Sequence, residues 1–346
     1  MSEAVVKDVD RQTDTSFEPS HWLDATPSEQ EWSRLTLSRD KRLAFETDIY
    51  FRESWADWCL IAGGTSCAER LSALAMLNLK PDAIVGRRGH AVIDYLEVNG
   101  FDLLAVAKIQ LGRHRSAALW RYNWNFATLD RVHLSTMMYA ANDTLMLLLR
   151  DRNFDGRVPG SVRLSALKGP ATGSKRSAHH LREVLRSPHR LLNFVHVADE
   201  PADIVREVGI LLKTRDRQAL FESAFDAAPG PMGDTYRSHV DALESCCPAH
   251  DLDLTASLDR LSEALSLDHA SRKRLKRAAL DGEKLRWDHY LRIADPANSC
   301  LASWDFFCVG CWVLADERPG FPDLLPSVEP AEWLRAGRPL QPRRLR

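Results

Sequence analysis

The sequence predicts an α+β protein in which a small mixed domain is followed by a largely helical region. Three observations lead to this prediction. Short unbroken apolar runs, typical of buried strands, are concentrated in the middle of the chain. Segments with apolar residues at helical spacing lie between these runs. After Arg215 the helical spacing continues, whereas strand-like runs are almost absent.

The middle of the chain alternates strand-like and helical segments in the β-α-β-β-α-β order of a ferredoxin-like fold, with extra helices. The predicted strands are residues 74–79, 101–111, 145–149 and 191–197. The predicted helices are residues 88–99, 115–124, 129–141 and 201–212. Gly100 is a typical helix stop and Pro201 a typical helix start. We expect a long loop between the third and fourth strands.

Three regions follow from this pattern. Residues 1–66 form an N-terminal extension, 67–214 the α+β domain and 215–346 a helical C-terminal region. The helices predicted in the last region are residues 254–265, 271–291 and 303–314, and the tail after Asp316 is rich in proline and arginine and is expected to be irregular. Residues 1–20 are polar and acidic, which predicts an unstructured lead instead of a signal peptide.

Composition restricts the partners and the compartment. The 346 residues are 45% hydrophobic and 27% charged, which is typical of a globular protein with a buried core. A net charge of -2 provides no general attraction to nucleic acid or to an anionic membrane, and no apolar run is long enough to span a bilayer. Seven scattered cysteines, without an export signal, indicate free thiols in a cytoplasmic protein.

Cys308 and Cys311 form a Cys-x-x-Cys pair, and Cys300, Cys246, Cys247 and His250 occur in the same region. A structural zinc site needs four such ligands brought together. The pair lies within a strongly aromatic run, however, and buried free cysteines behave as small apolar residues. We therefore interpret it as part of a buried helix and assign no metal ligand.

His196 is the best candidate for a reactive side chain. Asn193 lies three residues before it, Asp199 three residues after it and Glu207 eleven residues after it. A neutral imidazole at the end of a strand can attack a phosphoryl group, and a carboxylate on the next helix can hold one ring nitrogen while the other reacts. The first predicted strand ends in Lys80-Pro81-Asp82, where the lysine offers a point charge for phosphate.

These motifs together resemble the nucleoside diphosphate kinase family over residues 67–213. The resemblance implies a ferredoxin-like nucleoside diphosphate kinase-like domain, a phosphohistidine at His196, and catalytic support from Lys80 and Glu207. It implies Mg²⁺ and a nucleoside triphosphate such as ATP as the phosphoryl donor. The positions that match the nucleotide-binding and phosphate-binding residues of the family are Tyr122, Arg131, His133, Met137, Arg163, Thr172, Arg182 and Asn193.

The chain departs from the family at the expected base clamp and next to the histidine. His133 stands at the position of the clamping phenylalanine, Met137 at that of the leucine, and Ala198 at that of a serine. The acceptor is therefore either a nucleoside diphosphate or a specialised small molecule. The alternative is a non-catalytic nucleotide-binding or scaffolding protein with the same fold. The family's usual assembly leaves a homo-oligomer open, and we expect neither nucleic acid nor a membrane as a partner.

Overall fold

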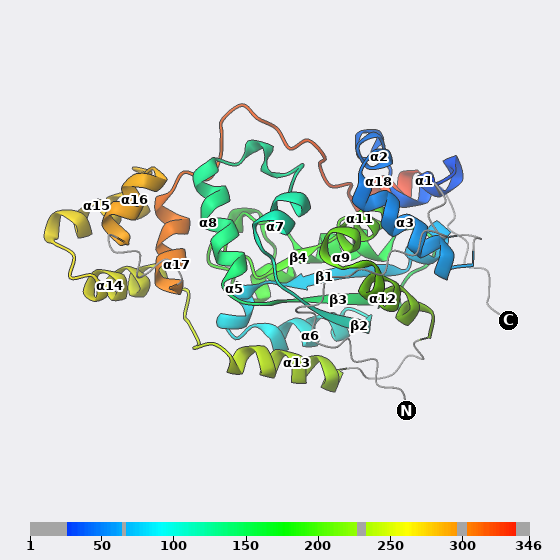
Figure 1. The fold of residues 1–346 in the computed structure, drawn as a ribbon, viewed down its shortest axis with the longest axis horizontal. Helices are drawn as coiled ribbons and strands as arrows, with labels where there is room; N and C mark the ends of the chain where they lie inside the picture. Colours follow the sequence, from blue (N-terminus) through cyan, green and yellow to red (C-terminus); the bar gives the residue numbers. More distant parts are fainter. Residues whose placement is uncertain (1–25, 64–66, 227–232, 296–302, 337–346) are drawn as a thin grey trace.

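The computed structural model describes residues 26–63, 67–226, 233–295 and 303–336. This part of the chain is a mostly helical α+β structure around one antiparallel sheet, whose strand order is β2-β3-β1-β4 (Figure 1). The strands are β1 (Leu74–Leu79), β2 (Phe101–Ile109), β3 (Thr144–Asp151) and β4 (Val195–Val197). The expected combination of a strand-containing middle and a helical C-terminal region is confirmed.

The central strand β1 is buried along its whole length and pairs with β3 on one side and β4 on the other. All but one of its residues are apolar because helices cover both faces of the sheet. Asn78 is the exception in this run: it is opposite Met146 in β3 and His196 in β4. Directly opposite residues of antiparallel strands share a face, so Asn78 and His196 lie on the same side of the sheet.

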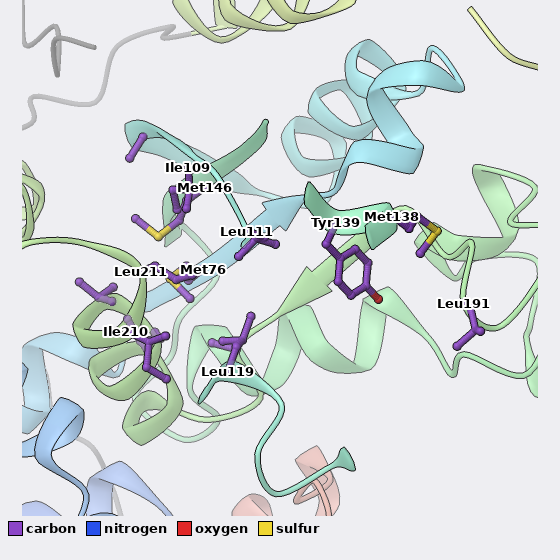
Figure 2. Packing of buried hydrophobic residues seen from close by; sticks show 14 of the residues in the cluster. Met76, Ile109, Leu111, Leu119, Met138, Tyr139, Met146, Leu191, Ile210 and Leu211 are labelled. Atoms are coloured by element: carbon purple, nitrogen blue, oxygen red, sulfur yellow. The ribbon is translucent and has the colours of Figure 1, made fainter. Parts of the chain in front are cut away.

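The two faces of the sheet belong to two apolar clusters. Ala75, Leu77 and Leu79 pack with side chains of α6 (Gly89–Val98), α9 (Gly160–Lys168) and α13 (Gly233–Ser245). Met76 and Met146 face the other side, where Met76 lies beside Ile210 and Leu211 (Figure 2). That side is covered by α8 (Leu129–Ala140), α11 (Pro201–Leu211) and α12 (Thr214–Asp226).

The N-terminal extension forms helices that belong to the same core. They are α1 (Glu29–Leu35), α2 (Arg39–Glu46), α3 (Ile49–Ile61) and α4 (Cys67–Leu71). Ser28, Ser38 and Asp48 accept backbone hydrogen bonds at the starts of the first three, as good N-caps do. Buried tryptophans of α1 and α3 then pack into the cluster on the His196 side of the sheet.

Buried ion pairs and one close backbone approach hold α11 against this extension. Lys41 of α2 pairs with Glu200 at 2.7 Å and with Asp203 at 2.6 Å. Arg206 pairs with Asp48 at 2.8 Å. A Cβ added at Gly209 would lie 2.2 Å from the Tyr50 carbonyl oxygen, so only glycine allows α3 and α11 to pack this closely. The extension thus helps to position α11.

The C-terminal helices pack beside α8 and form the left side of Figure 1. They are α14 (Leu254–Ala264), α15 (His269–Leu280), α16 (Trp287–Ala294) and α17 (Trp304–Val313). The chain then runs back across α8 to a short helix, α18 (Pro330–Arg335), beside α9. At the expected boundary near residue 215, α12 starts at Thr214 and its Arg217 Nε donates to Asp57 of α3 at 2.6 Å.

Several expected elements have different bounds. The predicted helix 271–291 is wrong, because the chain breaks between α15 and α16, where Gly282 has a φ of +77°. The strand expected at residues 191–197 is limited to β4, because Phe194 has a φ of +66° and its N–H donates to Asp82 Oδ2. The region expected to be a long loop contains α9 and α10 (Leu181–Val184). The remaining short elements are α5 (Pro81–Val85), α7 (Arg113–Leu119), η2 (Trp124–Phe126) and η3 (Gly173–Lys175).

In the described ranges, no helix is both long and apolar enough to cross a membrane. The predicted unstructured lead at residues 1–20 lies outside these ranges.

Candidate functional site

The candidate site is built around a histidine–carboxylate pair that joins β4 to α11. His196 Nε2 lies 2.9 Å from both carboxylate oxygens of Glu207. A carboxylate only accepts hydrogen bonds, so this contact places the ring proton on Nε2. Among the described residues no hydrogen bond to Nδ1 is formed, and the side chain is 19% exposed. With its proton on Nε2, the ring has a fixed orientation and Nδ1 has no hydrogen-bond partner within the described residues.

An aromatic wall stands beside the His196 ring. Trp120, which ends α7, meets it edge-on with ring centroids 5.6 Å apart. Trp120 also stacks on Trp124 at 5.5 Å and contacts Tyr139 of α8 at 4.7 Å. His196 is therefore held by Trp120 as well as by Glu207.

Buried cations lie at the end of β1. Lys80 is 2% exposed, and its Nζ lies 3.5 Å from Asp82, 3.3 Å from the Leu191 carbonyl oxygen and 5.2 Å from the centre of the Tyr139 ring. Arg182 donates to the carbonyl oxygens of Gly169 and Val195. Burial lowers the pKa of Lys80 and lowers that of Arg182 to about 10. Asp82 acts on both cations, and Asp199 also acts on Arg182.

Polar atoms without partners gather around the same place. Asn78 uses neither side-chain oxygen nor nitrogen, and Asp82 Oδ1, Arg131 Nε and Arg182 Nε are also buried and unpaired. Asn78 faces the same side of the sheet as His196, and Arg131 and Arg182 both act on the buried Tyr139 hydroxyl. A buried polar group without a partner costs about 1–3 kcal/mol. These groups therefore have unused hydrogen-bonding capacity.

In α8, His133 is stacked on the chain's own Trp287. The rings of these residues are 5.9 Å apart and inclined by 28°. The backbone N–H of Trp287 also donates to Asp130 at 3.2 Å, which joins α16 to the start of α8. Met137 is partly buried against the core. One face of the position expected to stack on a base is therefore covered by the C-terminal region.

A segment between α17 and α18, residues 315–329, crosses this side of the molecule (Figure 1, orange to red). At one end the Thr128 hydroxyl donates to the Ala315 carbonyl oxygen at 2.6 Å, and Arg190 pairs with Asp316 at 3.3 Å. At the other end Ser327 donates to Asp199 at 2.6 Å, three residues after His196. Residues 315–329 thus run from the start of α8 to the His196 side of the site.

Asp199 binds that segment, and both of its carboxylate oxygens accept hydrogen bonds. Ser165 and Lys168 of α9 donate to it as well, at 2.6 and 3.0 Å. Burial by itself would raise the pKa of Asp199, but Lys168, Lys41 and the two hydroxyl donors hold it well below its usual range. Its role here is to hold the surrounding segments together.

Some residues predicted for the site lie elsewhere or are used locally. Arg163 Nε donates to Asp151 at 2.6 Å and its guanidinium covers Phe101 at 4.1 Å. The Asp151 N–H donates to the carbonyl oxygen of Ala73. Ala73 lies five residues before Asn78, which is a distance of about 17 Å along an extended strand at about 3.3 Å per residue. The sheet thus separates Arg163 from His196, and its assignment to the phosphate clamp is not supported by this geometry.

Three other predicted residues have local surroundings. Tyr122 packs on Phe45 with centroids 6.0 Å apart. Asn193 Nδ2 donates to the Arg190 carbonyl oxygen at 2.7 Å. Thr172 is exposed in the segment before η3. The structure thus brings together His196, Glu207, Lys80, Arg182 and Arg131 from the predicted set.

Sequence reasoning missed Asn78, Trp120, Tyr139 and residues 315–329. An asparagine inside an apolar strand was a usable signal for Asn78, because a buried amide requires partners. The Cys-x-x-Cys pair is buried in α17 as predicted, and burial raises the pKa of Cys308 to about 11. Cys311 is buried beside it, and neither thiol belongs to a possible metal-ligand group within the described ranges; Cys300 lies outside them.

The fold and site define a mixed α+β protein with a histidine–carboxylate pair beside buried, incompletely paired cations. No protein-family model and no curated protein matches this sequence.

Proposed function

We propose that this protein is a phosphotransferase resembling nucleoside diphosphate kinases. It transfers the γ-phosphoryl group of a nucleoside triphosphate to His196 and then to an acceptor. The observation that supports this proposal most directly is the 2.9 Å contact between His196 Nε2 and Glu207, beside the buried cations Lys80 and Arg182. The antiparallel order β2-β3-β1-β4 supports the proposal, since a β-α-β-β-α-β chain of the ferredoxin-like type has this order.

In the first half-reaction, His196 Nδ1 attacks the γ-phosphorus and forms an N–P bond. The bond from phosphorus to the β-bridging oxygen breaks, and the diphosphate leaves with that electron pair. Glu207 stabilises the positive charge of the phosphorylated ring through the Nε2 proton. In the second half-reaction an acceptor oxygen attacks phosphorus, and the N–P electrons return to Nδ1.

Lys80, Arg182 and Arg131 provide positive charge for the phosphates, and the unpaired amide of Asn78 offers further hydrogen bonds. Such transfer depends mainly on positioning and on charge stabilisation. Most donor atoms around the site are nitrogens, so Mg²⁺ fits here through substrate phosphate oxygens, with Asp82 Oδ1 as the unpaired carboxylate oxygen. When bound, Mg²⁺ would neutralise charge that develops on the phosphates.

The acceptor is a nucleoside diphosphate or a specialised small molecule. Trp287 on His133 and residues 315–329 across the start of α8 support a restricted site. An open base clamp tolerates many bases, whereas extra polar and aromatic contacts select among them. The free thiols of the described cysteines fit our proposal that the protein acts in the cytoplasm.

Incubation with γ-labelled ATP and Mg²⁺ tests this proposal. The expected product carries label that is lost in acid and retained in base, as phosphohistidine is. His196→Ala should abolish it, while His239→Ala, a change on α13 away from the site, should retain it. Undiminished label in His196→Ala would remove His196 from the mechanism.

A second candidate function is nucleotide binding without catalysis. It is favoured by the stacking of His133 on Trp287, which leaves less of the base clamp free. Calorimetric binding of ATP by a protein that never becomes labelled would support this function over phosphotransfer.

A further inference from the structure

Two thiols and a carboxylate converge in the N-terminal extension, outside the His196 site. They are Glu31 of α1, Cys59 in the last turn of α3 and Cys67 at the start of α4. One ligand atom from each lies within 4.8 Å of the other two. Three separate helices therefore present oxygen and sulfur ligands to one point.

Glu31 has an unused ligand atom, whereas Cys67 lies within reach of the charge of Arg70. Glu31 Oε2 accepts from the Ser28 N–H and hydroxyl, and no hydrogen bond to Oε1 is formed within the described residues. Over the same residues, Glu31 is in no ion pair. The Cys59 and Cys67 thiols also interact with each other through a side-chain hydrogen bond.

A hydrogen bond from a side chain connects the two segments that carry the cysteines. The indole N–H of Trp58, next to Cys59, donates to the Cys67 carbonyl oxygen at 2.8 Å. Two thiolates on one tetrahedral zinc ion stand about 3.8 Å apart when each bond is about 2.3 Å. The ligand atoms of the observed group lie within 4.8 Å of one another, an upper limit about 1 Å above this spacing.

We propose that Glu31, Cys59 and Cys67 bind one Zn²⁺-class divalent cation, with water at a fourth position. Two thiolates favour such a borderline-soft metal over Mg²⁺ or Ca²⁺. Binding releases the two thiol protons to solvent, because the ligands are thiolates. The ion would join α1, α3 and α4, and α3 packs on α11, which carries Glu207.

A second group of possible metal ligands already has arginines beside it. His90, Asp241 and Glu244 also place ligand atoms within 4.8 Å of one another. However, His90 Nε2 already contacts Asp241 at 2.7 Å, and Arg237 lies 3.2 Å from its Nδ1. Glu244 lies 3.9 Å from Arg87. Arginines supply the positive charge there, so no ion is required.

The test uses the full chain, reduced and stripped of metal with a chelator. Zn²⁺ is titrated in competition with a chromophoric chelator, and Co²⁺ is added separately to detect thiolate-to-cobalt absorption. We expect one ion per chain, with no binding of Mg²⁺ at this position. Cys59→Ser should weaken Zn²⁺ binding at least about 100-fold and Glu31→Gln at least about 10-fold, since even residues behind the ligands are worth 10–100-fold.

Cys246→Ser is the matched control, because Cys246 is an exposed thiol of α13's end region, and it should bind Zn²⁺ as the wild type does. Cys59→Ser is the deciding variant because Cys59 is partly exposed. Cys67 is 1% exposed, so a serine there would also disturb the core. Wild-type affinity in folded Cys59→Ser would overturn the proposal. So would a Cys59–Cys67 disulfide in the oxidised protein together with no Zn²⁺ binding by the reduced protein.

Discussion

His196 and Glu207 meet through a 2.9 Å hydrogen bond although one lies on a strand and the other on the following helix. The chain turns at Glu200, which caps α11, and the helix then runs back along the sheet. Two turns of helix carry Glu207 to the His196 ring. Because α11 is fixed by the N-terminal extension, the carboxylate has little freedom to leave this position.

Glu207→Gln should slow the labelling of His196 by ATP about 10²–10⁴-fold, the usual contribution of a positioned acid–base partner. The amide cannot stabilise a positive ring as the carboxylate does. Nucleotide affinity should stay unchanged. Single-turnover labelling gives the rate and calorimetry the affinity, with the exposed Glu222→Gln as control. An unchanged labelling rate would mean that Glu207 does not support the reaction.

Arg182→Met and Arg163→Met should have different effects. Arg182 lies among the buried cations near β4, so its loss should weaken ATP binding by about tenfold or more, since hydrogen bonds to charged groups contribute about 1.5–3 kcal/mol. Arg163→Met should leave binding intact and lower the free energy of unfolding by about 3 kcal/mol, because Asp151 stays buried without its partner. Calorimetry and chemical denaturation measure the two quantities. Equal losses of ATP binding would contradict the placement of Arg163 outside the site.

Onward transfer to ordinary nucleoside diphosphates should be slower than the labelling of His196 by ATP. The reason is the contact of His133 with Trp287, together with the residues 315–329 that cross the start of α8. Turnover with ADP, GDP, CDP, UDP and dTDP provides the measurement. High and comparable rates with all five would show an unrestricted acceptor site.

His189 should make the stability of the protein depend on pH. Burial, together with Lys284, Arg190 and Arg131, lowers its pKa to about 3. In the unfolded chain the pKa is about 6.5, so between these values the unfolded state binds a proton that the folded state does not. The contribution of neutral His189 to the free energy of unfolding is therefore fully present above about pH 6.5. It is lost as the pH falls toward 3.

The comparison is with His189→Asn, whose amide oxygen can still accept from the Leu191 N–H. The wild type should lose about 2 kcal/mol more than the variant between pH 7.5 and pH 5, from the linkage of one proton. Denaturant titrations at the two pH values measure this difference. Parallel losses in both proteins would show that His189 is protonated in the folded state.

The sequence predicted the elements whose cause is local. The strand at Leu74–Leu79 was predicted from an apolar run, and α6 and α11 from helical spacing with clear start and stop residues. The break at Gly282 and the interruption at Phe194 were not predicted, because each depends on a positive φ that surrounding contacts stabilise. Helix α9 was missed because its apolar residues do not follow one helical face, and its buried positions include Gly160 and Ser161.

By itself, the sequence determined the mixed class, the helical C-terminal region and the spacing that links His196 to Glu207. Spacing is a local property, since a strand, a turn and two helical turns set the distance between these residues. Tertiary structure alone decided that Arg163 pairs with Asp151, that Asn78 lies opposite His196 and that Trp287 stacks on His133. These contacts join residues far apart in the chain, and they depend on how sheet, extension and C-terminal helices bury their apolar surfaces together.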